Sequence, residues 1–276
     1  ARLPVYAIII ALVIPEKRIF GVINMQGLTL MLLYLLGFGM AIFSAYILNK
    51  ILKIKGKTYF VVEMPNYKLP MFKNVAINVI EKTKAFVFGA GKIILAISIV
   101  LWFLASYGPG EKFNNAEKIV IEKTLLKPLN TSELQNAIAS QKLENSYIGL
   151  MGKTIEPVIS PLGYDWKIGV AIISSFAARE VFVGTLATIY SVGDSDNDNT
   201  IKNKMQAEIN PETGQKIFNF ASGISLLLFY AFAMQCASTI AITKKETNSW
   251  KWPLGQLIFM SGLAYLVALI AFQILK

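Results

Sequence analysis

An apolar run at residues 168–190 carries two opposite charges near its middle, Arg179 and Glu180. Its 23 residues match the hydrocarbon core of a bilayer, which a helix of about 20 apolar residues crosses. A charge at that depth costs roughly 2.5–3.5 kcal/mol on insertion scales, so such a pair must face a bundle interior or a wet cavity. The pair either locks two helices together as a structural ion pair or lines a solute path, and both interpretations fit this run.

Further apolar runs indicate that the whole chain is an all-α polytopic membrane protein. Of its 276 residues 54% are hydrophobic, against about 45–50% in soluble domains. Residues 28–48, 85–106, 217–243 and 254–275 are each long enough to cross a bilayer. The net charge of +10 lies in the connections between these runs, so it indicates orientation in a membrane and not nucleic-acid binding.

Two residue counts limit the chemistry of any site. The chain has no histidine, which excludes an imidazole-based metal or catalytic site, and one cysteine, Cys236, which excludes an intrachain disulfide. We expect no catalytic residue and no cofactor in this chain. An apolar run follows Ala1 almost at once without the charged start of a signal peptide, so we expect the sequence to begin partway through a longer protein.

The distribution of lysines predicts which connections face the cytoplasm. Residues 49–84 carry eight lysines against two acids, and residues 244–252 form a basic and aromatic belt, so both are expected inside. Within the first of these, residues 72–84 have the pattern of an amphipathic helix lying in the membrane interface. Three segments are expected outside: residues 111–145, residues 191–216 and Lys276. These assignments agree only if residues 168–190 form a broken or re-entrant hairpin that does not cross completely.

Several motifs spread over nearly the whole chain carry a family resemblance. They are residues 63–70 (EMPNYKLP), 93–96 (IILA), 99–104 (IVLWFL), 161–169 (PLGYDWKIG), 176–181 (FAAREV) and 245–252 (KETNSWKW). In this order they resemble the permease part of the bacterial ferrous iron transporter family FeoB, and residues 1–6 resemble the tail of that family's first gate motif. The sequence departs from the family pattern at Asn66, where Pro is common, at Arg179, where Lys is common, and at Met234 and Gln235, where Val-Pro often precedes the cysteine.

The resemblance implies a GTP-dependent Fe²⁺ uptake transporter of the bacterial inner membrane, with several spanning helices and two gate repeats of opposite orientation. It also implies an N-terminal GTPase domain that binds GTP and Mg²⁺, small cytoplasmic accessory proteins and a homo-oligomer. The expected parts are the end of the first gate repeat plus a spanning helix at 1–48, a cytoplasmic loop with an interfacial helix at 49–84, a spanning helix at 85–106, an extracytoplasmic helical insertion at 107–167, the second gate repeat at 168–243 and a C-terminal spanning helix at 244–276.

Candidate iron ligands follow from the same resemblance. Ferrous iron takes carboxylate, thiolate and thioether ligands when imidazole is lacking. The resemblance implies that Cys236 and Glu180 contact the ion in the pore, so we expect both to face one cavity. Without it, Cys236 would more readily be a small buried hydrophobic residue. Thr239 lies one turn beyond Cys236 on the same helical face and is an expected oxygen donor.

Five further residues belong to the candidate site. Glu63 and Met64 are expected at the cytoplasmic mouth, where they either bind the metal or dock the interfacial helix. Arg179, Arg2 and Pro4 are expected to have structural or gating roles. Two rival functions remain at this point: a gate-type transporter for a nucleoside or another organic solute, and a membrane scaffold that transports nothing.

Overall fold

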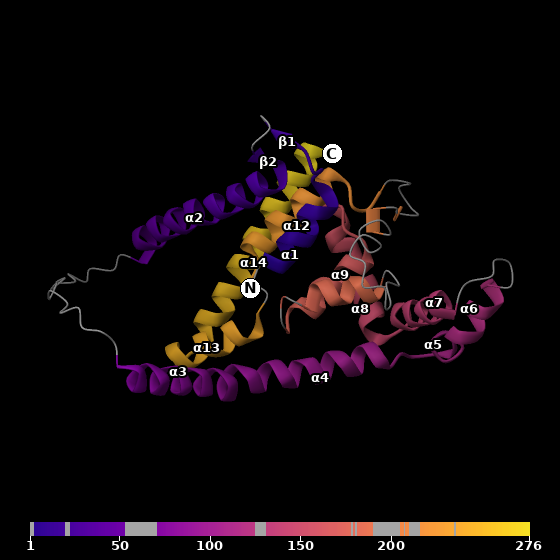
Figure 1. Cartoon of the computed structure of the whole chain (residues 1–276), viewed down its shortest axis with the longest axis horizontal. Coiled ribbons are helices and arrows are strands. Elements are labelled where there is room, and N and C mark those ends of the chain that lie inside the picture. Colours follow the sequence, from indigo (N-terminus) through magenta and orange to yellow (C-terminus); the bar gives the residue numbers. More distant parts are fainter. Residues whose placement is uncertain are drawn as a thin grey trace.

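Helices make up nearly all the regular structure in the computed structural model (Figure 1). The structure describes residues 3–19, 23–52, 71–124, 131–177, 179, 181–189, 205–206, 208–209, 216–234 and 236–276. The elements are α1 (Leu3–Val13), β1 (Arg18–Ile19), β2 (Ile23–Asn24), α2 (Met25–Leu52), α3 (Phe72–Phe86), η1 (Val87–Gly91), α4 (Lys92–Ser106), α5 (Glu111–Asn114), α6 (Ala116–Thr124), α7 (Thr131–Glu144), α8 (Tyr147–Ile159), η2 (Ser160–Leu162), α9 (Trp166–Ser175), α10 (Val181–Ile189), α12 (Phe220–Phe232), α13 (Ala237–Thr247) and α14 (Lys251–Leu275). The two short strands pair antiparallel.

Three segments of the described chain are long and apolar enough to cross a membrane. They are Met25–Lys50 in α2, Phe220–Thr247 formed by α12 and α13, and Lys251–Leu275 in α14. Shorter apolar helices are α1, α9 and most of α4. The predicted runs 28–48 and 254–275 lie within α2 and α14. These helices confirm the predicted all-α membrane fold.

Small residues and hydroxyl groups bring α12 and α14 together along the centre of the bundle (Figure 1). Ala264 and Ala268 of α14 are completely buried. The Ser225 hydroxyl of α12 donates to the Ala268 carbonyl oxygen at 3.0 Å, and the Tyr164 hydroxyl lies 2.9 Å from the Ser225 oxygen. Since the hydrogen of Ser225 is already used, Tyr164 is the donor of the second bond. Small side chains and interhelical hydrogen bonds are the usual means by which membrane helices associate.

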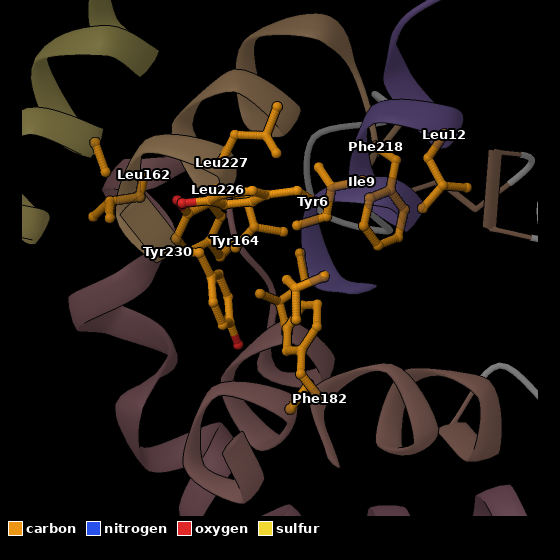
Figure 2. Close-up of a cluster of buried hydrophobic side chains, with 14 of the residues drawn as sticks. Tyr6, Ile9, Leu12, Leu162, Tyr164, Phe182, Phe218, Leu226, Leu227 and Tyr230 are labelled. Atoms are coloured by element: carbon orange, nitrogen blue, oxygen red, sulfur yellow. The ribbon is translucent and has the colours of Figure 1, made fainter. Parts of the chain in front are cut away.

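A second contact region joins α1, α10 and α12 (Figure 2). Gly223 of α12 lies so close to the Val13 side chain of α1 that an added Cβ would overlap it. The buried side chains drawn in Figure 2 include Tyr6, Ile9 and Leu12 from α1, Phe182 from α10, and Leu226, Leu227 and Tyr230 from α12. This packing fixes the start of α10 beside α12.

The start of α9 is fixed by a cap and by close contact with α8. The Asp165 carboxylate accepts a hydrogen bond from the Ile168 backbone N–H at 2.9 Å, which satisfies one of the free donors of the first turn. Gly152 of α8 leaves no room for a Cβ next to Val170, and Gly169 of α9 leaves little beside Ile159. These glycines let the two helix backbones approach closely, so α9 enters the bundle in a defined direction.

Residues 72–106 form one continuous helical path through α3, η1 and α4. The predicted interfacial helix, residues 72–84, corresponds to α3, whose described side chains are exposed. The predicted spanning segment, residues 85–106, begins in the last turn of α3 and continues through a π-helical turn, Val87–Gly91, into α4. The π-helical turn packs against α13. The junction between the two predicted segments is therefore helical, with a local widening and no loop.

Candidate functional site at the meeting point of two helix breaks

The first helix break separates α9 from α10 in the middle of the apolar run 168–190. Helix α9 ends at Ser175, Phe176 and Ala177 form a turn, and α10 begins at Val181. Helix α10 packs back against α9, and Val170 and Ile189 of the two helices belong to one buried cluster. The predicted break of this run into two helices that pack together is confirmed, and its incomplete crossing of the membrane stays a prediction.

The second break separates α12 from α13. Helix α12 ends at Phe232, and both Ala233 (φ −63°, ψ 137°) and Cys236 (φ −143°, ψ 109°) have extended backbone. Helix α13 begins at Ala237. Residues 232–237 contain no proline, so the interruption must be stabilised by contacts with another part of the bundle.

Two hydrogen bonds join the breaks and supply that stabilisation. The Ala237 backbone N–H donates to the Phe176 carbonyl oxygen at 3.1 Å. In the opposite direction, Nη2 of Arg179 donates to the Ala233 carbonyl oxygen at 3.0 Å. Each bond satisfies a backbone group that a helix end leaves free, which is essential where water is scarce. We call residues 176–181 and 233–239 the crossing.

Cys236 lies at the start of α13, where several donors surround its sulfur. The side chain is partly buried, and Sγ lies 2.7 Å from the hydroxyl oxygen of Ser238. The Thr239 hydroxyl and the backbone N–H groups of Ser238 and Thr239 also interact with this sulfur. The thiol is thereby held at the crossing, in a position from which it can bind a soft or borderline metal ion.

Tyr230 adds a buried polar group close to the same place. Its hydroxyl oxygen is buried and completes no hydrogen bond with the described residues. The hydroxyl faces Ser175 at the end of α9, and the Arg179 charge acts on it. Figure 2 shows the Tyr230 ring extending from α12 towards Phe182, and the two ring centroids are 4.7 Å apart. A buried hydroxyl of this kind has unused capacity for a water molecule or an ion.

A cavity of about 480 Å³ adjoins the first break, between α4 and the α9–α10 hairpin. The hairpin residues that line it include Ser174, Ala177, Val181 and Thr185, and those from α4 include Ser98. The Ser174 hydroxyl donates to the Val170 carbonyl oxygen at 2.9 Å, so its lone pairs are left as acceptors. The cavity therefore combines an apolar wall with a few hydroxyl oxygens.

The structure brings some of the predicted site residues together and leaves others outside its description. Arg179 and Cys236 lie on opposite sides of the crossing, and Thr239, which is exposed, interacts through its hydroxyl with the Cys236 sulfur. Pro4 is exposed in the first turn of α1. Glu180, Glu63, Met64 and Arg2 lie outside the described residues. Among the described residues, no group of three His, Cys, Asp or Glu side chains is placed to hold a metal ion.

Three residues in or next to the crossing were not predicted as site residues from the sequence. Ser238 contacts the Cys236 sulfur, Ser175 ends α9, and Tyr230 faces that end. A signal existed for Ser238, because it stands in the polar stretch that interrupts the apolar run 217–243. For Ser175 and Tyr230 the sequence offers no such signal, since their proximity depends on how α9 and α12 pack.

Two helix breaks that meet inside an apolar bundle define a gate-type membrane protein. Residues 87–250 match the family model Gate, described as nucleoside recognition, and residues 30–82 match a model described as ferrous iron transport protein B C terminus. The chain therefore belongs to the Gate family and corresponds to the C-terminal part of FeoB.

Curated relatives agree with this assignment over the whole chain. A Leptospira interrogans protein named Fe(2+) transporter FeoB is 42% identical over 99% of this chain, and a Leptospira biflexa protein of the same name is 40% identical over 100%. A Porphyromonas gingivalis protein, named as a fusion of Fe(2+) transport protein A with FeoB, is 31% identical over 99%. The chain spans 37% of the length of the two Leptospira relatives and 33% of the fusion protein. No solved structure matches this chain.

Proposed function

We propose that this chain is the permease portion of a ferrous iron uptake transporter and that Fe²⁺ passes along the crossing. The single observation that carries the proposal is the position of Cys236, whose thiol lies at the second helix break beside the backbone bond to Phe176. A break in a membrane helix is the arrangement that many transporters use for ion sites. The printed names of the relatives support iron as the ion.

The chemistry of the crossing suits a ferrous ion that exchanges part of its water shell for protein ligands. Cys236 would supply sulfur and release a proton on binding, because a metal takes the thiolate. Glu180, next to Arg179, would supply a carboxylate, and the Thr239 hydroxyl an oxygen. The backbone carbonyls that the two breaks free from helical bonding are further oxygen donors nearby.

Several further parts of the proposal concern the longer protein. An N-terminal GTPase domain, binding GTP and Mg²⁺, would bias the opening of the gate through the cytoplasmic loops, and the permease itself would carry no catalytic residue. Glu63 and Met64 would lie at the cytoplasmic mouth, and Arg2 and Pro4 would belong to the first gate repeat. The fusion relative supports a small accessory protein as a partner. We place the protein in the bacterial inner membrane as a multi-pass homo-oligomer.

A second candidate function rests on the description of the Gate family as nucleoside recognition. A nucleoside site would need side chains that pair with a base and a sugar, and the thiol at the crossing would have no role in it. In that case, substituting Cys236 would leave transport unchanged and nucleosides would compete with the solute.

The test is uptake of radioactive iron by the full-length protein in proteoliposomes, kept reduced and free of oxygen. We expect Cys236→Ser and Glu180→Gln each to lower uptake at least tenfold while the folded protein remains in the membrane. Thr247→Ser is the matched control, because Thr247 is exposed and ends α13, the helix that Cys236 caps. This variant should transport iron normally. Normal iron uptake in both site variants, or competition by an excess of nucleoside, would contradict the proposal.

A further inference from the structure

A second cavity, of about 540 Å³, lies on the α13 side of the crossing. Its lining residues fall into two groups with different chemistry. Phe176, Ala237, Ile240 and Ala241 form an apolar floor, and Lys244, Lys245, Asn248 and Trp250 form a polar rim. We call this cavity the lysine pocket.

The rim concentrates positive charge and hydrogen-bond donors on one side of the pocket. Nζ of Lys244 lies 4.0 Å from the centroid of the Trp250 ring, a cation–π contact that holds the ammonium group in place. Lys245 follows directly in sequence, and Asn248 ends α13 in the left-handed conformation with φ 50°. Of the acidic residues that the structure describes, none lines the pocket.

Lysines in the last turn of a helix also have an ordinary role, because they interact favourably with its free carbonyl groups. That role accounts for the presence of Lys244 and Lys245 at the end of α13. It does not account for the cavity between them and Phe176, or for the apolar floor that the cavity exposes. The combination of a cationic rim with an apolar floor fits a ligand that has an anionic head and an apolar body.

The position of the pocket points to the membrane as the source of that ligand. It lies at the junction between the candidate spans Phe220–Thr247 and Lys251–Leu275, and Trp250 and Trp252 flank this junction. Tryptophan side chains gather at the headgroup level of bilayers. Basic pockets between membrane helices bind anionic lipid headgroups in this way.

We propose that the lysine pocket binds one anionic phospholipid, with its phosphate on Lys244 and Lys245 and the upper part of an acyl chain on the apolar floor. The floor includes Phe176 and Ala237, whose backbones form one of the two bonds at the crossing. The lipid therefore binds directly behind the crossing. This site is separate from the thiol, and its rim charges disfavour a cation, so the inference does not depend on the transport of iron.

Native mass spectrometry of the full-length protein in neutral detergent tests this site. The probes are phosphatidylglycerol and phosphatidylcholine with identical acyl chains, added over a range of concentrations. We expect the first phosphatidylglycerol to bind with a lower Kd than phosphatidylcholine. Replacing both lysines in Lys244→Gln/Lys245→Gln should weaken the binding of phosphatidylglycerol about 30-fold, from the usual contribution of a lysine near an anionic lipid.

Two further variants separate a pocket from general charge attraction. Lys112→Gln/Lys118→Gln removes the same charge from exposed positions on α5 and α6 and should leave the Kd unchanged. Ala241→Phe keeps every charge but fills the floor, and it should remove the preference for phosphatidylglycerol.

The proposal would be overturned by equal binding of the two lipids, by retention of the preference in Ala241→Phe, or by an equal loss in the α5–α6 control. Displacement of phosphatidylglycerol by inorganic phosphate at millimolar concentration would assign the pocket to a soluble anion and would also overturn it.

Discussion

The bond from Arg179 to the Ala233 carbonyl oxygen is a sensitive point of the crossing. Its length is 3.0 Å, and its donor is charged. Hydrogen bonds to charged groups contribute about 1.5–3 kcal/mol, whereas hydrogen bonds between membrane helices average about 0.6 kcal/mol. We take about 1.5 kcal/mol as the expected loss when Arg179 is replaced by methionine, which has a similar length and no donor.

The loss of stability should appear as local opening of the crossing, because the Phe176 carbonyl oxygen holds the Ala237 N–H next to the bond that Arg179 makes. A loss of about 1.5 kcal/mol in local opening corresponds to roughly tenfold faster hydrogen exchange. We therefore expect the Ala237 amide to exchange about ten times faster in Arg179→Met. Arg179→Lys keeps a charged donor and should stay within about twofold of the parent protein.

Hydrogen exchange measured by mass spectrometry in nanodiscs reads this effect out at the peptide that contains Ala237. Gln273→Met is the matched control, since Gln273 also donates from its side chain to a backbone carbonyl, that of Pro161, at 3.3 Å. It should not alter exchange at Ala237. Unchanged exchange in Arg179→Met, or an equal rise at Ala268 within α14, would refute the local role of Arg179 at the crossing.

Three further substitutions test the surrounding fold, each by thermal or denaturant unfolding in detergent. Gly163→Ala should destabilise the protein by about 1–3 kcal/mol, because Gly163 has φ 82° and the Phe272 ring occupies the space that a Cβ needs; an unchanged midpoint would contradict this packing. Ser225→Ala should cost about 1–2 kcal/mol by removing the bond to Ala268 and leaving the buried Tyr164 hydroxyl without its acceptor. An unchanged stability would show that the bond between Ser225 and Ala268 contributes nothing. Burial raises the pKa of Asp165 from 3.8 to about 6, so the folded state holds the proton more tightly than the unfolded state. The free energy of unfolding should therefore fall by up to about 3 kcal/mol as pH rises from 4 to 6. Asp165→Asn should flatten this decline, and an equal slope in both proteins would contradict the effect of burial.

Much of the fold follows from segment length and charge. The runs 28–48 and 254–275 predicted α2 and α14 because a helix of that length and composition must be buried in lipid or protein. The distribution of lysines predicts the break in the run 168–190, because a helix that spanned the whole membrane there would put the flanking loops on the wrong sides. Structure adds where the break falls, after Ser175, and that the Asp165 cap starts the helix before it.

The rest of the site depends on contacts that no local pattern contains. The break before Cys236 has no proline, and it is stabilised by Arg179 and Phe176, which lie more than fifty residues earlier in the chain. Tyr230 meets the end of α9 for the same reason, through tertiary packing. The resemblance to FeoB motifs implies a role for Cys236, and helical spacing adds Thr239. The structure places the Thr239 hydroxyl against the Cys236 sulfur, and their role as iron ligands stays a prediction.

Protection of the Cys236 thiol by ferrous iron is the most direct test of a path through the crossing. The full-length protein in liposomes is treated with a small thiol-alkylating reagent under anaerobic conditions, and labelling of the peptide containing Cys236 is followed by mass spectrometry with and without Fe²⁺. We expect Fe²⁺ to slow this labelling in a concentration-dependent manner, Mg²⁺ to leave the rate unchanged, and Glu180→Gln to weaken the protection by Fe²⁺. Labelling of Cys236 at the same rate with and without Fe²⁺, in protein that still takes up iron, would contradict a path through the crossing.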